Sequence, residues 1–342
     1  MSVKTFAVVL IAHGEAETSG FLENYRVSRH TLDRASGVMH IPPLLRQVIS
    51  VSSSLKKKLR RAPVGGSPQN MLTRTQATSL QKHLDNHPLS SSGIRFEVRP
   101  AFSASEPYVE DVIAETRGYD GRILLPMAPV DNTLSCGYLC EQLAGVSTPE
   151  ELSRTRVVGR LWPDGQLHRT YLDHLFESGR ALPVSAAEHN VLMLLFHGTL
   201  IRDSKGGVPA FHTGQKETEA FAASLTNAIE SDSRNRWGKV VTAYLNHDVG
   251  GEWSAPSFDE VWKRVRGSGC RHVSLFAAGY FSDGNETIHR AGLLAASEPS
   301  MQIESIPCLN DSSAFASYLA VKVAGAASQI IAFSPDSRSE EM

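Results

Sequence analysis

The sequence has few of the features that mark disulfide-rich, zinc-bound or membrane-spanning proteins. It contains four cysteines in 342 residues, and none of them form a Cys-x-x-Cys pair, so neither a disulfide framework nor a zinc site is predicted. Cys136 and Cys140 are expected to lie one helical turn apart as buried thiols. The longest apolar runs, residues 6–12 and 191–196, fall short of the roughly 20 residues that a membrane span requires. No transmembrane segment is predicted, and peripheral contact with a membrane stays open.

The chain also lacks an excess of charge of either sign. It has 34 Lys and Arg residues against 36 Asp and Glu residues, which gives a formal net charge of −2. A chain without a basic excess gives no reason to expect nucleic acid as a partner, and a small-molecule site is favoured instead. No small-residue cleavage site follows the first apolar run, so we expect a cytoplasmic protein. The basic segment at residues 50–61 favours a solvated helix face over a membrane-surface or anion-binding patch.

Two apolar runs end in the same dipeptide. Residues 6–12 run into His13 and Gly14, and residues 191–196 run into His197 and Gly198. Each run is typical of a buried parallel strand, and the carboxyl ends of such strands border the ligand crevice of an open α/β sheet. A histidine at that place either faces a substrate or caps the strand. The repetition indicates two similar α/β domains that face one cleft.

The remaining pattern alternates strands with helices, which predicts an α/β fold with two doubly wound, Rossmann-like domains and parallel sheets. At 342 residues the chain is long for one hydrophobic core, which also favours two domains. The pattern loosens between residues 148 and 183. We therefore expect an N-terminal α/β domain over residues 1–180, a C-terminal α/β domain over residues 181–330 and a flexible tail over residues 331–342.

Two polar residues follow predicted strands of the second half, His197 and Glu286. The glutamate has an alternative interpretation, because Asp283-Gly-Asn-Glu286 is itself a helix-capping pattern. Aromatic residues occupy the segments between them. These residues belong either to the core or to an apolar slot for a flat hydrophobic ligand. They are Tyr244, Trp253, Tyr280 and Phe281.

Three segments of the second half, in this order, resemble motifs of the ferrochelatase family, whose enzymes insert iron(II) into a porphyrin. Residues 196–200 (Phe-His-Gly-Thr-Leu) resemble the histidine motif of that family. Residues 244–256 resemble its aromatic-turn-Trp-x-x-Pro segment, and residues 281–287 resemble its Ser-Asp-x-x-Glu-Thr motif. The first half agrees more faintly at residues 66–68 (Gly-Ser-Pro) and 124–129. The resemblance therefore spans nearly the whole chain.

This resemblance implies a chelatase fold with the porphyrin between two domains, and a lyase of heme biosynthesis that takes porphyrin and iron(II) as substrates. By the resemblance, His197 accepts a pyrrole proton or presents the metal, and Glu286 assists as a second metal ligand. The walls of the slot would bend the porphyrin and expose its nitrogens. No permanently bound cofactor is expected, and no iron–sulfur cluster. The porphyrin-binding residues implied are Tyr244, Trp253, Tyr280, Phe281 and Ser282.

The chain departs from the family pattern where metal is thought to be delivered. Gly284 stands where the family usually has a histidine, Arg290 where it tends to carry an acid, and Gly292 in place of a further acid. An arginine repels a divalent ion, so metal would have to arrive elsewhere, such as past His247 and Asp248. Three functions therefore remain open: a ferrochelatase-like lyase, a chelatase for another metal or substrate, and a non-catalytic tetrapyrrole-binding protein.

Overall fold

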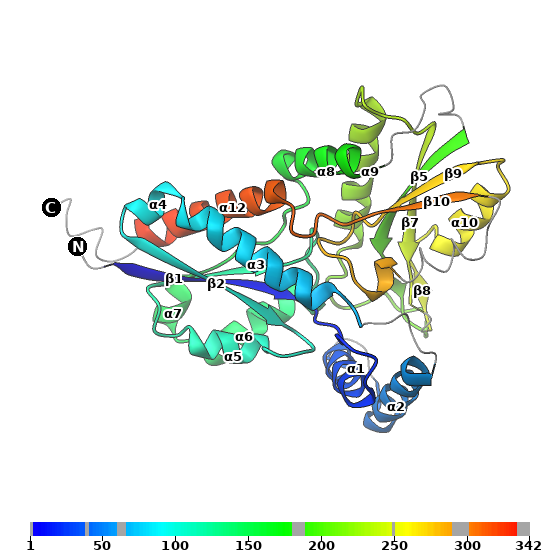
Figure 1. Ribbon diagram of the computed structural model, residues 1–342. Helices are drawn as coiled ribbons and strands as arrows, with labels where there is room; N and C mark the ends of the chain where they lie inside the picture. The colour runs from blue at the N-terminus through cyan, green and yellow to red at the C-terminus, as the bar shows by residue number, and fades with distance from the viewer. Residues whose placement is uncertain are drawn as a thin grey trace. The chain divides into compact units, whose positions relative to one another are not determined.

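The protein was analysed as a computed structural model that describes residues 3–37, 41–59, 66–179, 189–247, 250–288 and 301–333. The chain divides into two compact units, which are drawn together in Figure 1. Unit 1 comprises Met1–Met127, Thr133–Gly159 and Asp311–Met342. Unit 2 comprises Ala128–Asn132 and Arg160–Asn310.

Unit 1 is built on one parallel four-stranded sheet in the order β2-β1-β3-β4. The central strand β1 is buried over residues 6–12, as a strand covered on both faces should be. The strands are β1 (Lys4–Ala12), β2 (Ile94–Phe102), β3 (Gly121–Pro126) and β4 (Thr155–Val157).

Helices cover both faces of this sheet. Figure 1 shows α3 and α12 on one face and α5, α6 and α7 on the other. Val9 and Leu124 of the sheet pack on Val112 of α5 and Leu139 of α6 in one apolar cluster. The helices of unit 1 are α1 (Phe21–Ala35), α2 (Pro43–Leu59), α3 (Gln69–Asp85), α4 (Pro88–Ser91), α5 (Val109–Glu115), the π-helix η1 (Thr133–Gly137), α6 (Tyr138–Val146), α7 (Pro149–Ser153) and α12 (Ser313–Ala332).

Unit 2 repeats this plan with a parallel four-stranded sheet in the order β10-β9-β5-β7. Two short strands, β6 and β8, form a separate antiparallel ribbon; along the chain β6 follows β5 and β8 follows β7. The strands are β5 (Asn190–His197), β6 (Leu200–Arg202), β7 (Lys239–Leu245), β8 (Glu252–Trp253), β9 (His272–Phe276) and β10 (Gln302–Ile306).

The central strand β5 packs helices on each of its faces. Val191 and Leu195 belong to the cluster that buries Val261 of α10, whereas Phe196 meets Phe221 of α9 edge to face at 5.8 Å. The described helices of unit 2 include α8 (Gly165–Ser178), α9 (Gln215–Ser231) and α10 (Phe258–Arg266). The prediction of two doubly wound domains with parallel sheets is confirmed.

The division into units differs from the predicted boundary near residue 180. Helix α8 packs on α9 and therefore belongs to unit 2, which begins its main segment at Arg160. Helix α12 packs on α3 and β3, so the chain returns to unit 1 after Asn310. The predicted tail from residue 331 begins too early, because α12 continues to Ala332. Residues 334–342 lie outside the described part of the chain.

Helix α12 is, by length and composition alone, apolar enough to cross a membrane, which the search for long apolar runs missed. Of its most apolar window, 56% is buried inside the protein. Phe315, Leu319 and Val323 are among its buried side chains. Packing within unit 1 therefore accounts for its hydropathy.

Two local predictions were wrong. Residues 15–45 are polar and rich in turn residues, which predicts a long loop with short helices, but they hold the 15-residue helix α1 and the start of α2. Cys136 and Cys140 do follow one another along η1 and α6, yet Cys140 is exposed and Cys136 only half-buried. Both thiols lie on helices that present part of their surface to solvent.

Candidate functional site

The candidate site lies at the carboxyl ends of three neighbouring strands of unit 2. His197 is the last residue of β5, His247 follows β7 by two residues, and Glu286 lies in the segment after β9. Since β5 pairs with both β7 and β9, the fold brings these three side chains to one edge of the sheet.

The three side chains form a group that can hold a metal ion. Their ligand atoms all lie within 4.8 Å of one another, and His197 Nε2 lies 3.1 Å from His247 Nε2. Two nitrogens bound at about 2.0–2.1 Å to one ion lie roughly 2.9–3.4 Å apart, so the imidazole spacing already suits a shared ion. Both histidines are exposed and Glu286 is half-buried, which leaves the group open to a ligand.

The orientation of the His197 ring is fixed by its own backbone. Nδ1 lies 2.7 Å from the carbonyl oxygen of Gly198. A carbonyl oxygen only accepts, so Nδ1 must carry the proton and donate it. In the neutral ring, Nε2 then carries the lone pair, and this nitrogen faces His247. His197 can therefore accept a proton or bind a metal through Nε2.

Glu286 is held by a tyrosine within the same segment. The hydroxyl of Tyr280 donates to Glu286 Oε2 at 2.6 Å. The bonds that close the turn before residues 285–288 are made by other residues: Thr287 Oγ1 accepts from the backbone N–H of Gly284 and donates to Asp283. Asp283 and Thr287 therefore close this turn, and the hydroxyl of Tyr280 gives the Glu286 carboxylate a partner at the candidate site.

Two aromatic rings flank the group. The rings of His247 and Trp253 meet edge to face with centroids 5.4 Å apart, and the rings of His197 and Tyr280 lie 6.3 Å apart. Both Trp253 and Tyr280 are half-buried, so each presents part of its ring to a ligand. Of the five predicted porphyrin-binding residues, Trp253 and Tyr280 therefore lie next to the candidate metal ligands.

The other three predicted porphyrin-binding residues lie in the interior. Phe281 is 1% exposed and packs near Tyr171, and Tyr244 is 5% exposed and packs near Phe196. Burial raises the pKa of the Tyr244 hydroxyl. Ser282 is also buried. These three side chains are buried in the interior of unit 2, and their burial argues against their assignment as substrate contacts.

The strand ends are tied together through their backbones. The N–H of Gly198 donates to the carbonyl of Leu245 at 2.9 Å, and the N–H of Gly279 donates to the carbonyl of Leu195 at 3.0 Å. A Cβ at Gly279 would lie 2.8 Å from Phe196 Cα, so only glycine allows this approach. These links hold His197 at a fixed place relative to the segments after β7 and β9.

The histidine at the end of β1 has different surroundings in unit 1. His13 Nε2 lies 3.2 Å from the hydroxyl of Thr31 on α1. The next residue, Gly14, donates its N–H to the side-chain oxygen of Gln69 at 3.0 Å. Within the described residues, His13 belongs to no group of three metal-binding side chains.

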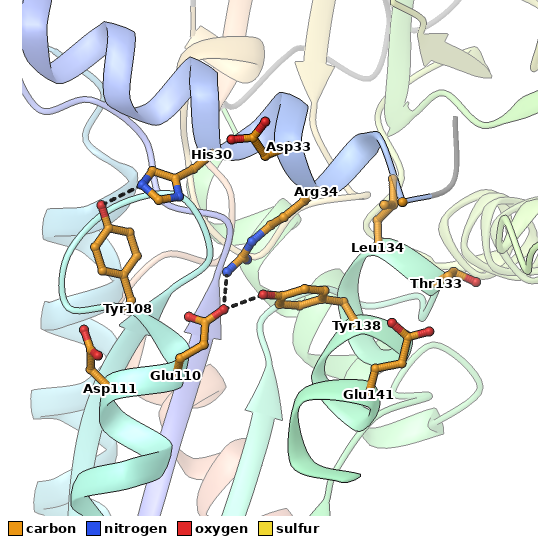
Figure 2. Close-up of a pocket in the computed structure, with 11 residues that line it drawn as sticks. His30, Asp33, Arg34, Tyr108, Glu110, Asp111, Thr133, Leu134, Tyr138 and Glu141 are labelled. Atoms are coloured by element: carbon orange, nitrogen blue, oxygen red, sulfur yellow. Dashed lines mark hydrogen bonds and ion pairs between the residues drawn. The ribbon is translucent and has the colours of Figure 1, made fainter. Parts of the chain in front are cut away.

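Unit 1 also contains a cavity of about 560 Å³ between α1, the start of α5, and η1 with α6, and Figure 2 shows its lining. Arg34 pairs with Glu110 at 3.0 Å and lies over the ring of Tyr138, which also donates to Glu110. Burial, together with that bond, raises the pKa of Tyr138 to about 12. His30 lies 3.2 Å from the hydroxyl of Tyr108. None of the predicted site residues lines this cavity.

The departures from the family pattern are only partly visible. Gly284 is buried in the turn before Glu286, where its N–H bonds to Thr287. Arg290, Gly292 and Asp248 lie outside the described residues. His247 was predicted only as a stage on an alternative metal path, but it lies beside His197.

Comparisons with known proteins agree with the motifs. The family model described as Ferrochelatase matches residues 5–327. A ferrochelatase of Neisseria meningitidis is 26% identical over 259 residues, which are 72% of this chain and 69% of that protein. A ferrochelatase of Escherichia coli is 26% identical over 279 residues, which are 78% of this chain and 80% of that protein.

Among solved structures, SirB from Bacillus subtilis with Fe3+ aligns at 12% identity and a TM-score of 0.48, and the alignment covers 96% of both chains. Because the family model spans nearly the whole sequence, this chain belongs to the ferrochelatase family of tetrapyrrole metal chelatases.

Proposed function

We propose that this chain inserts iron(II) into a porphyrin. The observation that carries the proposal is the group of His197, His247 and Glu286, whose ligand atoms lie within 4.8 Å of one another at the strand ends of unit 2. Family membership supplies the reaction class, and the group supplies the donors that the reaction requires. Insertion removes two pyrrole protons and strips water from the ion, so it needs a base and metal ligands in one place.

His197 is the proposed proton acceptor or metal ligand. Its Nδ1 proton is bonded to the Gly198 carbonyl, so Nε2 is available for one partner at a time. Glu286 is the proposed assisting carboxylate, which neutralises the positive charge that gathers as the ion approaches. Tyr280 orients this carboxylate through its hydroxyl. Trp253 and Tyr280 are the proposed contacts for the faces of the porphyrin.

His247 is proposed as a third metal ligand, one that compensates for the family residues this chain lacks. Two imidazoles and one carboxylate are a ligand set that holds iron(II) and leaves coordination positions open. The open positions are what a delivery site requires, because the porphyrin nitrogens must displace the remaining ligands. This role would make the histidine and the acid that the family usually carries at the positions of Gly284 and Arg290 dispensable for metal binding.

The alternative within the family is a chelatase for another divalent metal. The observation that favours it is the pair of imidazoles, since imidazole also suits cobalt, nickel and zinc. A tetrapyrrole-binding protein without activity is the second alternative, and the absent family histidine at Gly284 motivates it.

One experiment separates these functions. The purified protein is mixed without oxygen with protoporphyrin or coproporphyrin and with iron(II), cobalt(II) or zinc(II), and metallation is followed by absorbance. We expect fastest turnover with iron(II). Faster turnover with another metal would establish the first alternative, and porphyrin binding without metallation by any of the metals would establish the second.

The role of His247 has its own test. His247→Ala should weaken cobalt(II) binding at least tenfold, as measured by the visible spectrum of the bound ion without porphyrin. The matched control is His212→Ala, which removes an exposed histidine of unit 2 whose partner is Glu217. Equal cobalt affinity in both variants would exclude His247 from the ligand set.

A further inference from the structure

The separation of His197 and His247 depends on more than the pairing of their strands. Their Nε2 atoms lie 3.1 Å apart, although both side chains are exposed and each follows a different strand. The ladder between β5 and β7 ends where His197 pairs with Leu245, so His247 lies two residues beyond the last paired residue. A ligand site requires that its side chains be held in one geometry. Other contacts therefore have to fix the segment that carries His247.

Asn246 fills the space between the two segments. It directly precedes His247, and its side chain reaches back to Gly198, which directly follows His197. A Cβ at Gly198 would overlap Asn246 Oδ1 and would lie 2.9 Å from Asn246 Cα, so the amide packs against the bare Cα of the glycine. On its other side, Asn246 Nδ2 donates to the carbonyl oxygen of Ser254 at 2.9 Å. One side chain thus joins three segments at the edge of the sheet.

The amide oxygen of Asn246 is buried and has no hydrogen-bond partner among the described residues. A buried acceptor without a partner costs stability, and such groups are uncommon in folded proteins. Packing on Gly198 and the single bond to Ser254 therefore determine where this side chain lies. A role in holding the site accounts for the cost better than a contribution to stability does.

Ser254 anchors this contact. The hydroxyl of Ser254 accepts from the N–H of Thr199 at 3.0 Å and lies 2.7 Å from the hydroxyl of Thr199. The N–H of Ser254 donates to the carbonyl of Thr199 at 3.0 Å. Ser254 is 5% exposed and directly follows Trp253, the last residue of β8. The segments that carry His197, His247 and Trp253 are therefore bonded into one unit.

We propose that Asn246 is a positioning residue that sets the separation of the His197 and His247 imidazoles. This role rests on the proposed binding of one metal ion by both histidines. Because Asn246 is pressed on Gly198 and bonded to Ser254, it fixes the backbone from which His247 projects. The imidazoles then already stand at the separation that a shared ion requires, so binding does not have to order them. Without Asn246 both ligands remain, but His247 is free to move.

The test measures cobalt(II) binding to the full chain without porphyrin, by the visible spectrum of the bound ion. Asn246→Ala should lower the affinity about tenfold, which is the usual effect of removing a residue that orients a metal ligand. Asn246→Ser, whose hydroxyl is too short to reach both Gly198 and Ser254, should lower it by a similar factor and provides a second variant. Urea unfolding shows that each variant folds.

The matched control is Asn190→Ala, at the opposite end of β5. Asn190 is 4% exposed, and its Nδ2 donates to the carbonyl oxygen of Arg236, which lies before β7, at 3.3 Å. The control loses the same kind of bond beside the same two strands, at roughly 20 Å from the metal ligands. It should lower the urea midpoint of unfolding at least as much as Asn246→Ala does. Its cobalt affinity should stay within about twofold of that of the unmodified chain.

A double variant tests whether Asn246 acts through His247. Once His247→Ala has removed the ring, Asn246→Ala leaves nothing to misplace, so the double variant should bind cobalt as weakly as His247→Ala alone. Ser254→Ala should lower the affinity less than Asn246→Ala does. It removes the hydroxyl that bonds to Thr199 but keeps the carbonyl oxygen that accepts from Asn246.

The proposal is overturned if the unmodified chain binds no cobalt, or if Asn246→Ala and Asn246→Ser keep its cobalt affinity. It is also overturned if Asn190→Ala loses as much affinity, since the loss would then reflect a general loosening of unit 2. Additive losses in the double variant would likewise exclude an action through His247. A chain that binds cobalt through both histidines but metallates no porphyrin would refute the proposed function and leave the role of Asn246 intact.

Discussion

Strands β1 and β5 both end in His-Gly, yet the two histidines have unlike neighbours. His197 meets His247 and Glu286, two further metal-binding side chains, whereas His13 meets the hydroxyl of Thr31. The strands themselves are alike, each a buried apolar run at the centre of a parallel sheet. The difference therefore arises from the residues that follow the neighbouring strands.

The adjacent strand ends decide what each histidine can do. In unit 2, β7 runs into His247 and β9 leads to Glu286, so donors converge on His197. In unit 1, the segment after β2 brings Ser103 and Ala104, whose N–H groups bond to the carbonyls of Ala12 and His13. A repeated strand-His-Gly pattern thus specifies a position on the sheet, and the neighbours specify the chemistry.

The largest expected effect comes from removing each histidine in turn. His197→Ala should lower the rate of metal insertion by ~10²–10⁴, the usual contribution of general-base catalysis, whereas His13→Ala should lower it far less. Anaerobic absorbance assays with saturating porphyrin measure both rates. Equal losses of rate in the two variants would mean that His13 and His197 contribute alike to metal insertion, and the functional difference between the two strand ends would be disproved.

Glu286→Gln should lower turnover at least tenfold while porphyrin binding is unchanged. The amide keeps the shape of the side chain but loses the charge that assists the ion. Turnover and porphyrin fluorescence quenching are measured on the same preparation. Unchanged turnover in the folded variant would show that Glu286 does not assist metal insertion and that only His197 and His247 of the three side chains take part.

The two glycines test how firmly each histidine is held. Gly14 has φ of +85°, and a Cβ there would lie 2.8 Å from Phe102 Cβ, so Gly14→Ala should destabilise the protein by about 2–4 kcal/mol. Gly198→Ala would bring Cβ within 2.9 Å of the Leu245 carbonyl oxygen and push β5 from β7. It should destabilise somewhat less but also weaken cobalt binding, which Gly14→Ala should leave unchanged. Urea unfolding and cobalt titration distinguish the two.

Tyr280→Phe should have the smallest effect. It removes one hydrogen bond to a carboxylate, worth about 1.5–3 kcal/mol at most, and the half-buried Glu286 can turn to water instead. We expect turnover to fall less than in Glu286→Gln, with unchanged thermal stability. A loss as large as that of Glu286→Gln would show that the phenol itself takes part.

Much of the fold could be predicted because local patterns determine it. Residues 6–12 and 191–196 are too apolar to lie anywhere but in the centre of a sheet, and the alternation of strands and helices then predicts two doubly wound domains. The return of α12 to unit 1 could not be predicted, because it depends on packing against α3, more than 200 residues earlier. Nor could the exposure of Leu44, Val48 and Leu55 on α2, since apolar residues at helical spacing ordinarily predict a buried face.

The site was predictable only as far as its motifs reach. His197 and Glu286 follow strands and match family motifs, so sequence alone identified them as candidates. The place of His247 depends on β7 being the neighbour of β5, which strand order decides and sequence spacing does not. Phe281 and Ser282 were assigned to the substrate because they stand within a motif, but their side chains point into the interior.

The return of the chain to unit 1 has a consequence for the order of folding during synthesis. The segments of unit 2 all precede Asp311, whereas α12, which packs on the sheet of unit 1, follows them in the chain and emerges from the ribosome after them. We expect the second unit to fold first, which reverses the usual order from the N-terminus. Until α12 has emerged, the apolar residues of α3 and β3 on which it packs are open to chaperones, and the docking of α12 covers them.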